Sequence, residues 1–311
     1  MTATCAGTCV SARPTPPMPK TEKARAIAVF AHNEARKIIA CLESVKENIS
    51  AEDECFVLNN GSKDNTKELV ADFAKENPFC KLVDIAIGDK ANAWNVFVHE
   101  LDIKANLFCF VDGDCEVLPG SLDALQRCID RHPAANVAAA IPARSASPRI
   151  RREMLRNGGL AGNFYALPGR FVTRIRESGF RLPTGLIGDD SLVGALAYWD
   201  LDPRGTWDTR RLAVCEEAEY TYTRLSYFSL HDIRLYYRRK TRYSLRHFQT
   251  EMMKSPLKQL GLAGIPRNVT DLYRAAAPEV RLAWRGIDTW FDWLALKQIK
   301  ACAARGRTEA E

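Results

Sequence analysis

The sequence predicts an α/β/α sandwich around a mainly parallel, doubly wound sheet, followed by a helical extension at the C-terminus. Two observations lead to this fold class. Between Arg25 and Ala143, short apolar runs alternate with amphipathic stretches of helical length, a pattern typical of strands joined by right-handed helical crossovers. Beyond Ser226 the sequence is predominantly helical and basic.

Five strands and four helices are expected in the first half of the chain. The apolar runs predict strands at residues 26–31, 55–58, 81–87, 107–111 and 136–141. Amphipathic periodicity predicts helices at residues 34–46, 64–75, 91–101 and 118–131. Ligands bind beyond the carboxyl ends of the strands in such sheets, so the segments that follow the strands are candidates for function.

We divide the chain into four parts. Residues 1–23 form a leader that is expected to be disordered, because it is rich in Thr, Ala and Pro and lacks the apolar run of a signal peptide. Residues 24–145 and 146–255 form two halves of the α/β domain, and residues 256–311 form the helical extension. The Trp-rich segment around Trp284 and Trp290 is expected to pack against the α/β domain. Lys297, Lys300 and Arg305 leave peripheral membrane binding as an alternative.

The composition of the 311 residues, 46% hydrophobic and 26% charged, is that of a globular protein. No run of apolar residues is long enough to span a bilayer. The ten cysteines include no CxxC pair, which argues against a zinc or redox site and, without a signal peptide, for a cytoplasmic protein. The net charge of +6 suits a phosphate-bearing substrate or an anionic membrane surface, and is too small to indicate nucleic acid.

The strongest local signal is the acidic pair Asp112 and Asp114, directly after the apolar run at residues 107–111. A buried strand would bring both carboxylates to one place, and Gly113 between them allows a close approach of chain or ligand. Like charges this close repel unless a cation lies between them, and Mg²⁺ prefers one or two carboxylates together with substrate phosphates. Taken alone, the tripeptide is more often an acidic turn.

Polar clusters also follow the three preceding strands, at residues 31–34, 59–64 and 88–95. Helix capping explains any one of them equally well, with Asn33, Ser62 or Asp64, and Asp89 as the caps. Four such clusters at one edge of a sheet are harder to explain by capping. Together they predict a nucleotide site.

These motifs resemble those of the family 2 glycosyltransferases, which have the GT-A fold with a Rossmann-like sheet. The resemblance covers residues 26–243 and rests on AHNEA (31–35), NNGSKDNT (59–66), GDKANAWN (88–95), DGD (112–114) and a segment at 162–193. It implies inverting sugar transfer with Mn²⁺ or Mg²⁺ from a nucleotide sugar, usually a UDP-sugar. The acceptor would be a glycan, a lipid-linked sugar or a small molecule. Residues 24–145 would bind the donor and residues 146–255 the acceptor.

The resemblance assigns the donor site to residues at the strand ends. Those that would contact the nucleotide are Ala31, Asn33, Glu34, Asn59, Asn60, Asp64, Lys90, Asn95 and Asp112. Asp114 would be the direct metal ligand, and Asp112 would face both metal and ribose. The family commonly has an Asp where this chain has Asn59 or Asn60. An amide oxygen is a weaker hydrogen-bond acceptor than a carboxylate, so the identity of the base stays open.

A second acidic pair, Asp189 and Asp190, matches the place where the family has its catalytic base. An inverting transfer needs one base to take the proton of the attacking hydroxyl. The resemblance favours Asp190 for this role, with Asp189 as the second choice. Two adjacent carboxylates can raise one pKa toward the working pH. The alternative is an N-cap for the following helix, and both interpretations can hold.

Three further features have weaker support. Arg239 and Arg242, in the basic stretch at residues 238–243, would add to a diphosphate clamp, although a solvated helix face is favoured slightly. His231 is a candidate metal or phosphate contact, although a lone His is more often structural. A loop of small and polar residues would form a flexible acceptor-side wall, or simply a loop: Gly158, Gly159, Gly162, Asn163 and Tyr165.

Three other functions have less support than glycosyl transfer. A nucleotidyltransferase usually has a Gly-rich, basic phosphate loop after its first strand, and this chain has His32-Asn33-Glu34 there. A non-catalytic nucleotide-sugar-binding protein is expected to have lost one of the acidic pairs, and both are present. A dinucleotide dehydrogenase lacks support because no GxGxxG follows the first strand.

Overall fold

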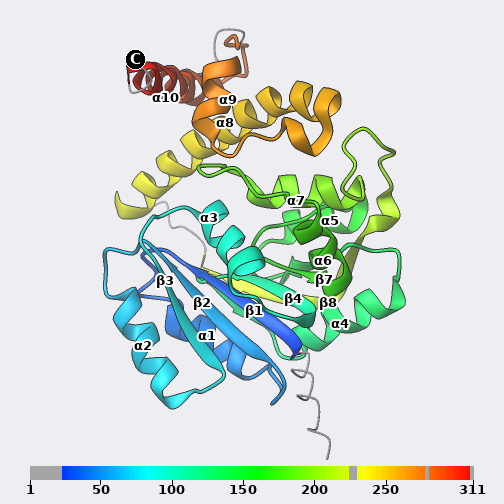
Figure 1. Ribbon diagram of the computed structural model, residues 1–311. Coiled ribbons are helices and arrows are strands. Elements are labelled where there is room, and N and C mark those ends of the chain that lie inside the picture. Colours follow the sequence, from blue (N-terminus) through cyan, green and yellow to red (C-terminus); the bar gives the residue numbers. More distant parts are fainter. Residues whose placement is uncertain (1–22, 224–229, 277–279, 309–311) are drawn as a thin grey trace, which may run out of the picture.

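The computed structural model describes residues 23–223, 230–276 and 280–308 (Figure 1). Residues 1–22 of the expected leader therefore lie outside the described residues. An eight-stranded sheet forms the centre of the molecule, with the strand order β3-β2-β1-β4-β7-β6-β8-β5. Its strands are β1 (Lys23–Ala31), β2 (Glu54–Asn60), β3 (Cys80–Ile85), β4 (Ala105–Asp112), β5 (Cys115–Val117), β6 (Val137–Pro142), β7 (Phe164–Pro168) and β8 (Leu212–Tyr222).

The first four strands in the sheet order, β3-β2-β1-β4, are all parallel. Their carboxyl ends therefore meet at one edge, where the polar clusters were predicted to gather. The remainder of the sheet is mixed, because β7 pairs antiparallel with both β4 and β6, and β5 pairs antiparallel with β8. The predicted α/β fold is confirmed. One difference is that β7 lies between β4 and β6, which correspond to consecutive predicted strands.

Helices cover both faces of the sheet (Figure 1). One face packs against α1 (Ile38–Lys46), α2 (Thr66–Glu76) and α4 (Ser121–Arg131). The other packs against α3 (Lys90–Asn95), α5 (Pro148–Asn157), α6 (Gly169–Glu177) and α7 (Asp189–Tyr198). Alternate residues of β1 point to the two faces, so Ala28 lies in one core and Val29 in the other, both fully buried.

Three helix starts or ends differ from the prediction. Residues 34–37 form a turn, so that α1 begins only at Ile38. The expected helix at 91–101 is a short α3 continued by a π-helix, Val96–Glu100. The expected helix at 118–131 begins at Ser121, after a turn in which the N–H of Leu118 bonds to Glu219 of β8. The strand Cys115–Val117 just before this turn was not predicted. Apolar periodicity alone does not distinguish a short strand from the first turn of a helix.

The C-terminal region consists of α8 (Leu230–Leu260), α9 (Val269–Ala276) and α10 (Asp288–Thr308), which lie together at one end of the molecule (Figure 1). α10 packs against α8 and α9. The expectation that the Trp-rich segment packs into the core is wrong for its most prominent members: Trp284 and Trp290 are 85% and 55% exposed. No helix among the described residues is long and apolar enough to cross a membrane.

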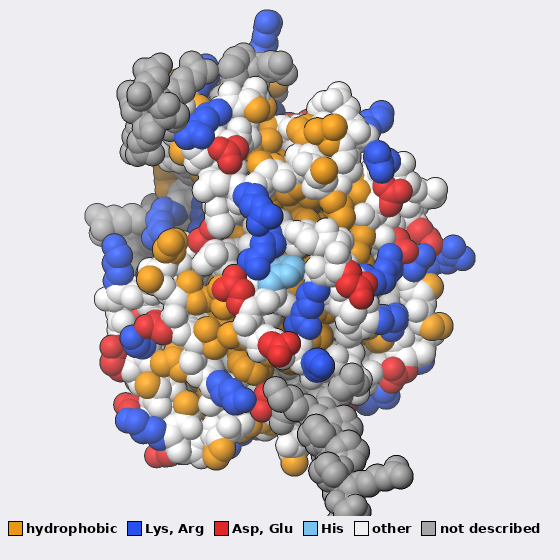
Figure 2. Space-filling view, in the orientation of Figure 1, with side chains coloured by type: hydrophobic (Ala, Val, Ile, Leu, Met, Phe, Trp, Pro, Cys, Tyr) orange, Lys and Arg blue, Asp and Glu red, His pale blue; other side chains and the backbone are white. Residues whose placement is uncertain are grey.

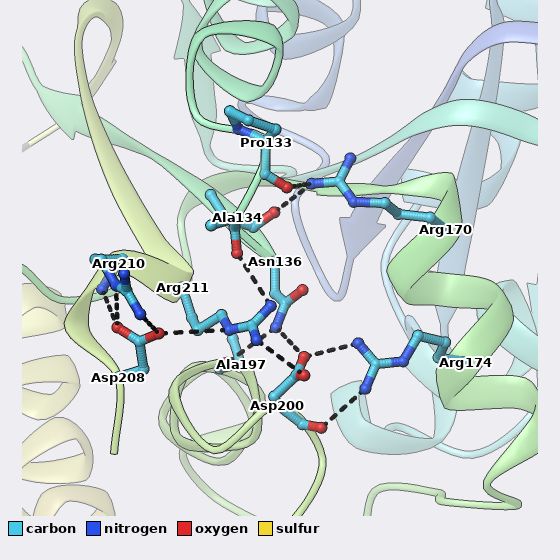
Figure 3. A network of polar contacts seen from close by, with 11 residues as sticks. Pro133, Ala134, Asn136, Arg170, Arg174, Ala197, Asp200, Asp208, Arg210 and Arg211 are labelled. Carbon is cyan, nitrogen blue, oxygen red and sulfur yellow. Dashed lines mark hydrogen bonds and ion pairs between the residues drawn. The ribbon is translucent and has the colours of Figure 1, made fainter. Parts of the chain in front are cut away.

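A polar network fixes the C-terminal end of α7 at the edge of the sheet opposite the polar clusters (Figure 3). The Oδ1 atom of Asp200 accepts hydrogen bonds from Arg174 of α6 (2.7 Å) and from Asn136 (2.8 Å), and Arg211 lies 3.2 Å from Oδ2. Asn136 also donates to the carbonyl oxygen of Ala197 in α7. The network thus joins α6, α7 and the segments that lead into β6 and β8. Elsewhere, charges of both signs are interspersed over the face shown in Figure 2.

Candidate active site

The loops after β1 and β2 are tied to each other through Asn33 and Asp64. The Oδ1 atom of Asn33 accepts a hydrogen bond from the backbone N–H of Lys63 (2.7 Å), and the N–H of Asn33 donates to the Ser62 hydroxyl (3.0 Å). The carboxylate of Asp64 accepts bonds from the N–H groups of Ala35 (3.2 Å) and Thr66 (3.1 Å). Burial raises the pKa of Asp64, but the hydrogen bond from the Thr66 hydroxyl, followed by these N–H bonds, outweighs burial and lowers the pKa. Both residues hold the loops in shape.

Asn59 and Asn60 lie at the end of β2 with different partners. The Nδ2 atom of Asn59 donates to Asp84 of β3 (2.7 Å), while its Oδ1 atom is buried and has no hydrogen-bond partner among the described residues. The Oδ1 atom of Asn60 accepts from the N–H of Asp89 (2.7 Å). Asn59 therefore offers the free acceptor. Lys67, followed by Asn59, lowers the pKa of Asp84, so a charged carboxylate that the sequence analysis missed lies beside it.

Lys90 lies between the two acidic pairs. Its Nζ atom is 2.6 Å from Oδ1 of Asp112 and 3.7 Å from Oδ2 of Asp189, and it donates to the carbonyl oxygen of Gly162 at 3.3 Å. Burial disfavours its charge, but the carboxylates of Asp112 and Asp189 outweigh that effect and raise the pKa of Lys90. Burial raises the pKa of Asp112 to about 7, against the opposing charge of Lys90. Lys90 therefore links the C-terminal end of β4 to the N-terminal end of α7.

Glu34 and Asp114 complete a crowded acidic edge. Burial, followed by the charge of Asp114, raises the pKa of Glu34 to about 7. Asp114 has one basic neighbour, Lys37, at 3.5 Å. The N–H of Gly113 donates to the carbonyl oxygen of Phe30 (2.8 Å), and a Cβ atom at Gly113 would lie only 2.8 Å from that oxygen. Only glycine fits here, which explains why the two carboxylates are separated by one.

The donor set at this edge fits a hard divalent cation only in part. No group of three or more His, Cys, Asp or Glu side chains among the described residues is arranged to hold a metal ion. Asp112 and Asp114 supply carboxylate oxygens, and Mg²⁺ uses one or two such ligands when phosphate oxygens and water complete its shell. Burial is the main cause of the raised pKa values of Asp112 and Glu34, and the charge of Asp114 adds to both. These residues are compatible with a metal that binds together with a diphosphate.

Asp189 and Asp190 are the first two residues of α7, after Gly188 at the N-cap. Oδ2 of Asp189 is buried without a hydrogen bond, and Oδ1 of Asp190 lies 3.4 Å from Nη2 of Arg246 on α8. Burial raises the pKa of Asp190, and Arg246 opposes that rise. Gly188, and neither Asp189 nor Asp190, occupies the N-cap position. The backbone N–H of Ser191 bonds to the carboxylate of Asp190, and the helix N-terminus stabilises both negative charges.

Arg246 is the most informative residue that the sequence analysis missed. It lies on α8 with Arg239 and Arg242, at positions i, i+3 and i+7, so the three share one helix face. Arg239 and Arg242 are exposed and have no ion pair among the described residues. Arg246, one turn further on, also donates to the hydroxyl of Ser191. The helical spacing from Arg239 and Arg242 could have identified Arg246 as a member of the same basic face. The side chain of His231 lies outside the described residues.

Two predicted side chains have structural roles instead. The amide of Asn95 donates to the carbonyl oxygen of Leu182 (2.8 Å) and accepts from its N–H (2.9 Å), and the residue is buried, so both polar atoms of its side chain already serve the fold. Tyr165 is buried, stacks on Phe110 at 4.7 Å and bonds to Trp94, so it belongs to the core and does not form an acceptor wall. Ala31 is buried at the end of β1 opposite Asn59.

The rest of the predicted acceptor-side loop approaches the carboxylates. Asn163 donates to Oδ2 of Asp112 at 3.4 Å. A Cβ atom at Gly162 would lie 2.8 Å from Cβ of Asp190, so the glycine allows this loop to pack directly on α7. Gly158 and Gly159 adopt positive φ angles, which favour glycine.

The strand order, the acidic pair after β4 and the second pair at the start of α7 define a GT-A glycosyltransferase fold. The sequence profile described as Glycosyl transferase family 2 matches residues 26–185. The chain therefore belongs to glycosyltransferase family 2 and is a glycosyltransferase, which disfavours the nucleotidyltransferase alternative. No curated protein sequence matches the chain.

Solved structures agree with this fold. The mannosyltransferase PcManGT from Pyrobaculum calidifontis, in complex with GDP-Man and Mn²⁺, has a TM-score of 0.57 and 16% identity over 97% of this chain and 92% of that chain. TarS 1-349 from S. aureus, in complex with UDP-GlcNAc, has a TM-score of 0.51 and 14% identity over 92% of both chains. At these identities the likeness concerns the fold.

Proposed function

We propose that the chain transfers a sugar from a nucleotide sugar, with a UDP-sugar as the expected donor, to an acceptor hydroxyl with inversion. The observation that supports this most strongly is the position of Lys90, 2.6 Å from Asp112 and 3.7 Å from Asp189. It joins a donor-side carboxylate and an acceptor-side carboxylate from distant parts of the sequence. Two acidic groups with separate roles in one site suit a reaction with a leaving group on one side and a nucleophile on the other.

On the donor side, the unpaired Oδ1 atom of Asn59 is the proposed acceptor for the imide N–H of a base, which reaches this buried atom only when neighbouring side chains move. Asn33 and Asp64 hold the surrounding loops. Lys90 lies where it can contact a phosphate oxygen as well as Asp112. Asp114, with Asp112, would hold Mn²⁺ or Mg²⁺, which would offset the charge on the departing diphosphate. Arg239 and Arg242 are the basic residues of α8 that we assign to the same diphosphate.

On the acceptor side, Asp190 is the proposed general base. The acceptor oxygen forms a bond to the anomeric carbon while the bond from that carbon to the diphosphate oxygen breaks, and the hydroxyl proton passes to Asp190. Arg246 keeps Asp190 ionised before the step and holds its orientation. Asp189, held near Lys90, positions the start of α7.

The test is a panel of UDP-, GDP- and dTDP-sugars, measured by donor hydrolysis and by thermal stabilisation with Mn²⁺ or Mg²⁺. One nucleotide class should stabilise the fold, by about 2.7 kcal/mol at a hundred times its Kd. Asp114→Asn should abolish transfer and metal-dependent nucleotide binding, and Asp190→Asn should reduce transfer to a small residual rate while nucleotide binding is kept. Asp72→Asn, on the exposed face of α2, is the matched control. Normal turnover of Asp114→Asn in EDTA would refute the role of the metal.

A further inference from the structure

An exposed aromatic surface covers the C-terminal helices. It consists of Tyr236, Tyr237, Trp284, Ile287, Trp290 and Trp293, which are between 42% and 85% exposed. These side chains line a depression of about 790 Å³. Single exposed apolar side chains are common, but a contiguous group of large ones usually marks an interaction site.

α10 has two faces of different character. Its buried face, which packs toward the other C-terminal helices, includes Phe291, Ala295 and Ile299. Its exposed face is a stripe at helical spacing, formed by Trp290, Trp293, Lys297 and Lys300. The aromatic half of this stripe continues directly into a cationic half, and Nζ of Lys297 lies 5.6 Å from the ring centre of Trp293.

The charge around the aromatic surface is one-sided. The two acidic residues of α10 are neutralised, since Asp288 pairs with Lys240 at 2.7 Å and Asp292 with Arg285 at 3.3 Å. A second depression, of about 530 Å³, adjoins the first and is lined by Arg281, Lys297 and Lys300. None of these three has an ion pair with a described residue. Within the described part of the chain, positive charge is therefore left uncompensated beside the exposed aromatic side chains.

We propose that the aromatic surface, together with Arg281, Lys297 and Lys300, docks on an anionic lipid bilayer. Trp and Tyr favour the membrane–water interface, where the ring is buried and its polar atom stays hydrated. Trp284 and Ile287 project furthest into solvent and would enter the headgroup region, while the three cations contact lipid phosphates. A second copy of the chain fits less well, because a self-complementary interface would bring the same positive charges together.

Binding of the full-length chain to vesicles tests this proposal independently of sugar transfer. Vesicles of phosphatidylcholine alone are compared with vesicles that contain phosphatidylserine, by co-sedimentation at low and high salt. We expect strong preference for the anionic vesicles and weaker binding as salt rises. Brominated lipids should quench the Trp fluorescence of the bound protein. Equal binding to neutral and anionic vesicles, or no quenching, would overturn the proposal.

Paired substitutions locate the surface. Trp284→Ala/Ile287→Ala should lower the partition coefficient at least about tenfold. Lys297→Glu/Lys300→Glu should lower it at least about 25-fold, because each basic residue near an anionic surface contributes roughly fivefold. The matched controls are Leu260→Ala/Ile150→Ala and Lys104→Glu/Lys258→Glu, exposed residues on other surfaces. These controls should bind like the wild type.

Two results would contradict the proposal. One is an equal loss of vesicle binding in the controls and in the paired variants, since binding would then not involve this surface. The other is a concentration-dependent dimer, seen by light scattering, that Trp284→Ala/Ile287→Ala abolishes, because the aromatic surface would then be a protein interface. Thermal unfolding of each variant confirms that the fold is retained.

Discussion

Gly162→Ala tests whether the position of Asp190 governs turnover. The added methyl group would lie 2.8 Å from Cβ and 3.0 Å from Cγ of Asp190, whereas carbon atoms in contact are about 3.5–4.0 Å apart. Asp190, or the loop against it, must therefore shift by about 1 Å. Misplacement of a reacting group by 1 Å costs on the order of 10²-fold in rate. We expect that loss in kcat.

The assay is initial-rate transfer or donor hydrolysis, with nucleotide binding measured separately by calorimetry. Binding should be unchanged. Gly194→Ala is the matched control, because it adds a methyl group to α7, the helix that carries Asp190, at 3.3 Å from Leu160. That gap needs only a small adjustment.

A double-mutant cycle with Asp190→Asn completes the test. Because Gly162→Ala is expected to act through Asp190, adding it to Asp190→Asn should cost little further activity. A second hundredfold loss in the double variant would show that Gly162 acts in another way, and the reasoning would be refuted.

Arg246→Gln should move the acidic limb of the pH–rate profile to higher pH. Arg246 lowers the pKa of Asp190 against the effect of burial, so its removal should raise that pKa. Because the base works only when deprotonated, activity is lost as pH falls through this pKa. An unshifted limb would contradict the assignment. Arg25→Met should destabilise the fold by about 3–5 kcal/mol in urea unfolding, since it leaves Asp53 buried without its partner at 2.6 Å. Asn95→Ala should lower the melting temperature without changing the affinity of the folded protein for nucleotide; weakened affinity would restore the predicted donor role.

Much of the donor side could be predicted from the sequence because it depends on local order. Each of the first four strands of the sheet order ends in a polar segment, and parallel pairing brings those ends together whatever the details of the loops. Asp112 and Asp114 could be recognised for this reason. The specific role of Asn95 could not, because its hydrogen bonds go to Leu182, a partner distant in sequence and without a recognisable pattern.

The features that the sequence did not predict depend on pairing between residues far apart in the chain. Nothing in the alternation of strands and helices predicts that β7 lies antiparallel between β4 and β6, and Tyr165 on that strand was therefore assigned to a loop when it belongs to the core. Asp84 was not predicted because its hydrogen bond to Asn59 joins two neighbouring strands, and the sequence does not show which residues of β2 and β3 face each other. The exposure of Trp284 and Trp290 could not be read from helical spacing, which shows that side chains share a face without showing what covers that face.

The network around Asp200 anchors the C-terminal end of α7. About 15 Å of helix separate Asp200 from Asp190, so a tilt of about 4° about the anchored end would displace the proposed base by about 1 Å. Arg174, Asn136 and Arg211 bind Asp200 at the edge of the sheet opposite the two acidic pairs. Substitutions in this network would tilt α7 and so change the position of Asp190 relative to the acceptor hydroxyl. They would alter turnover although they lie far from the proposed base.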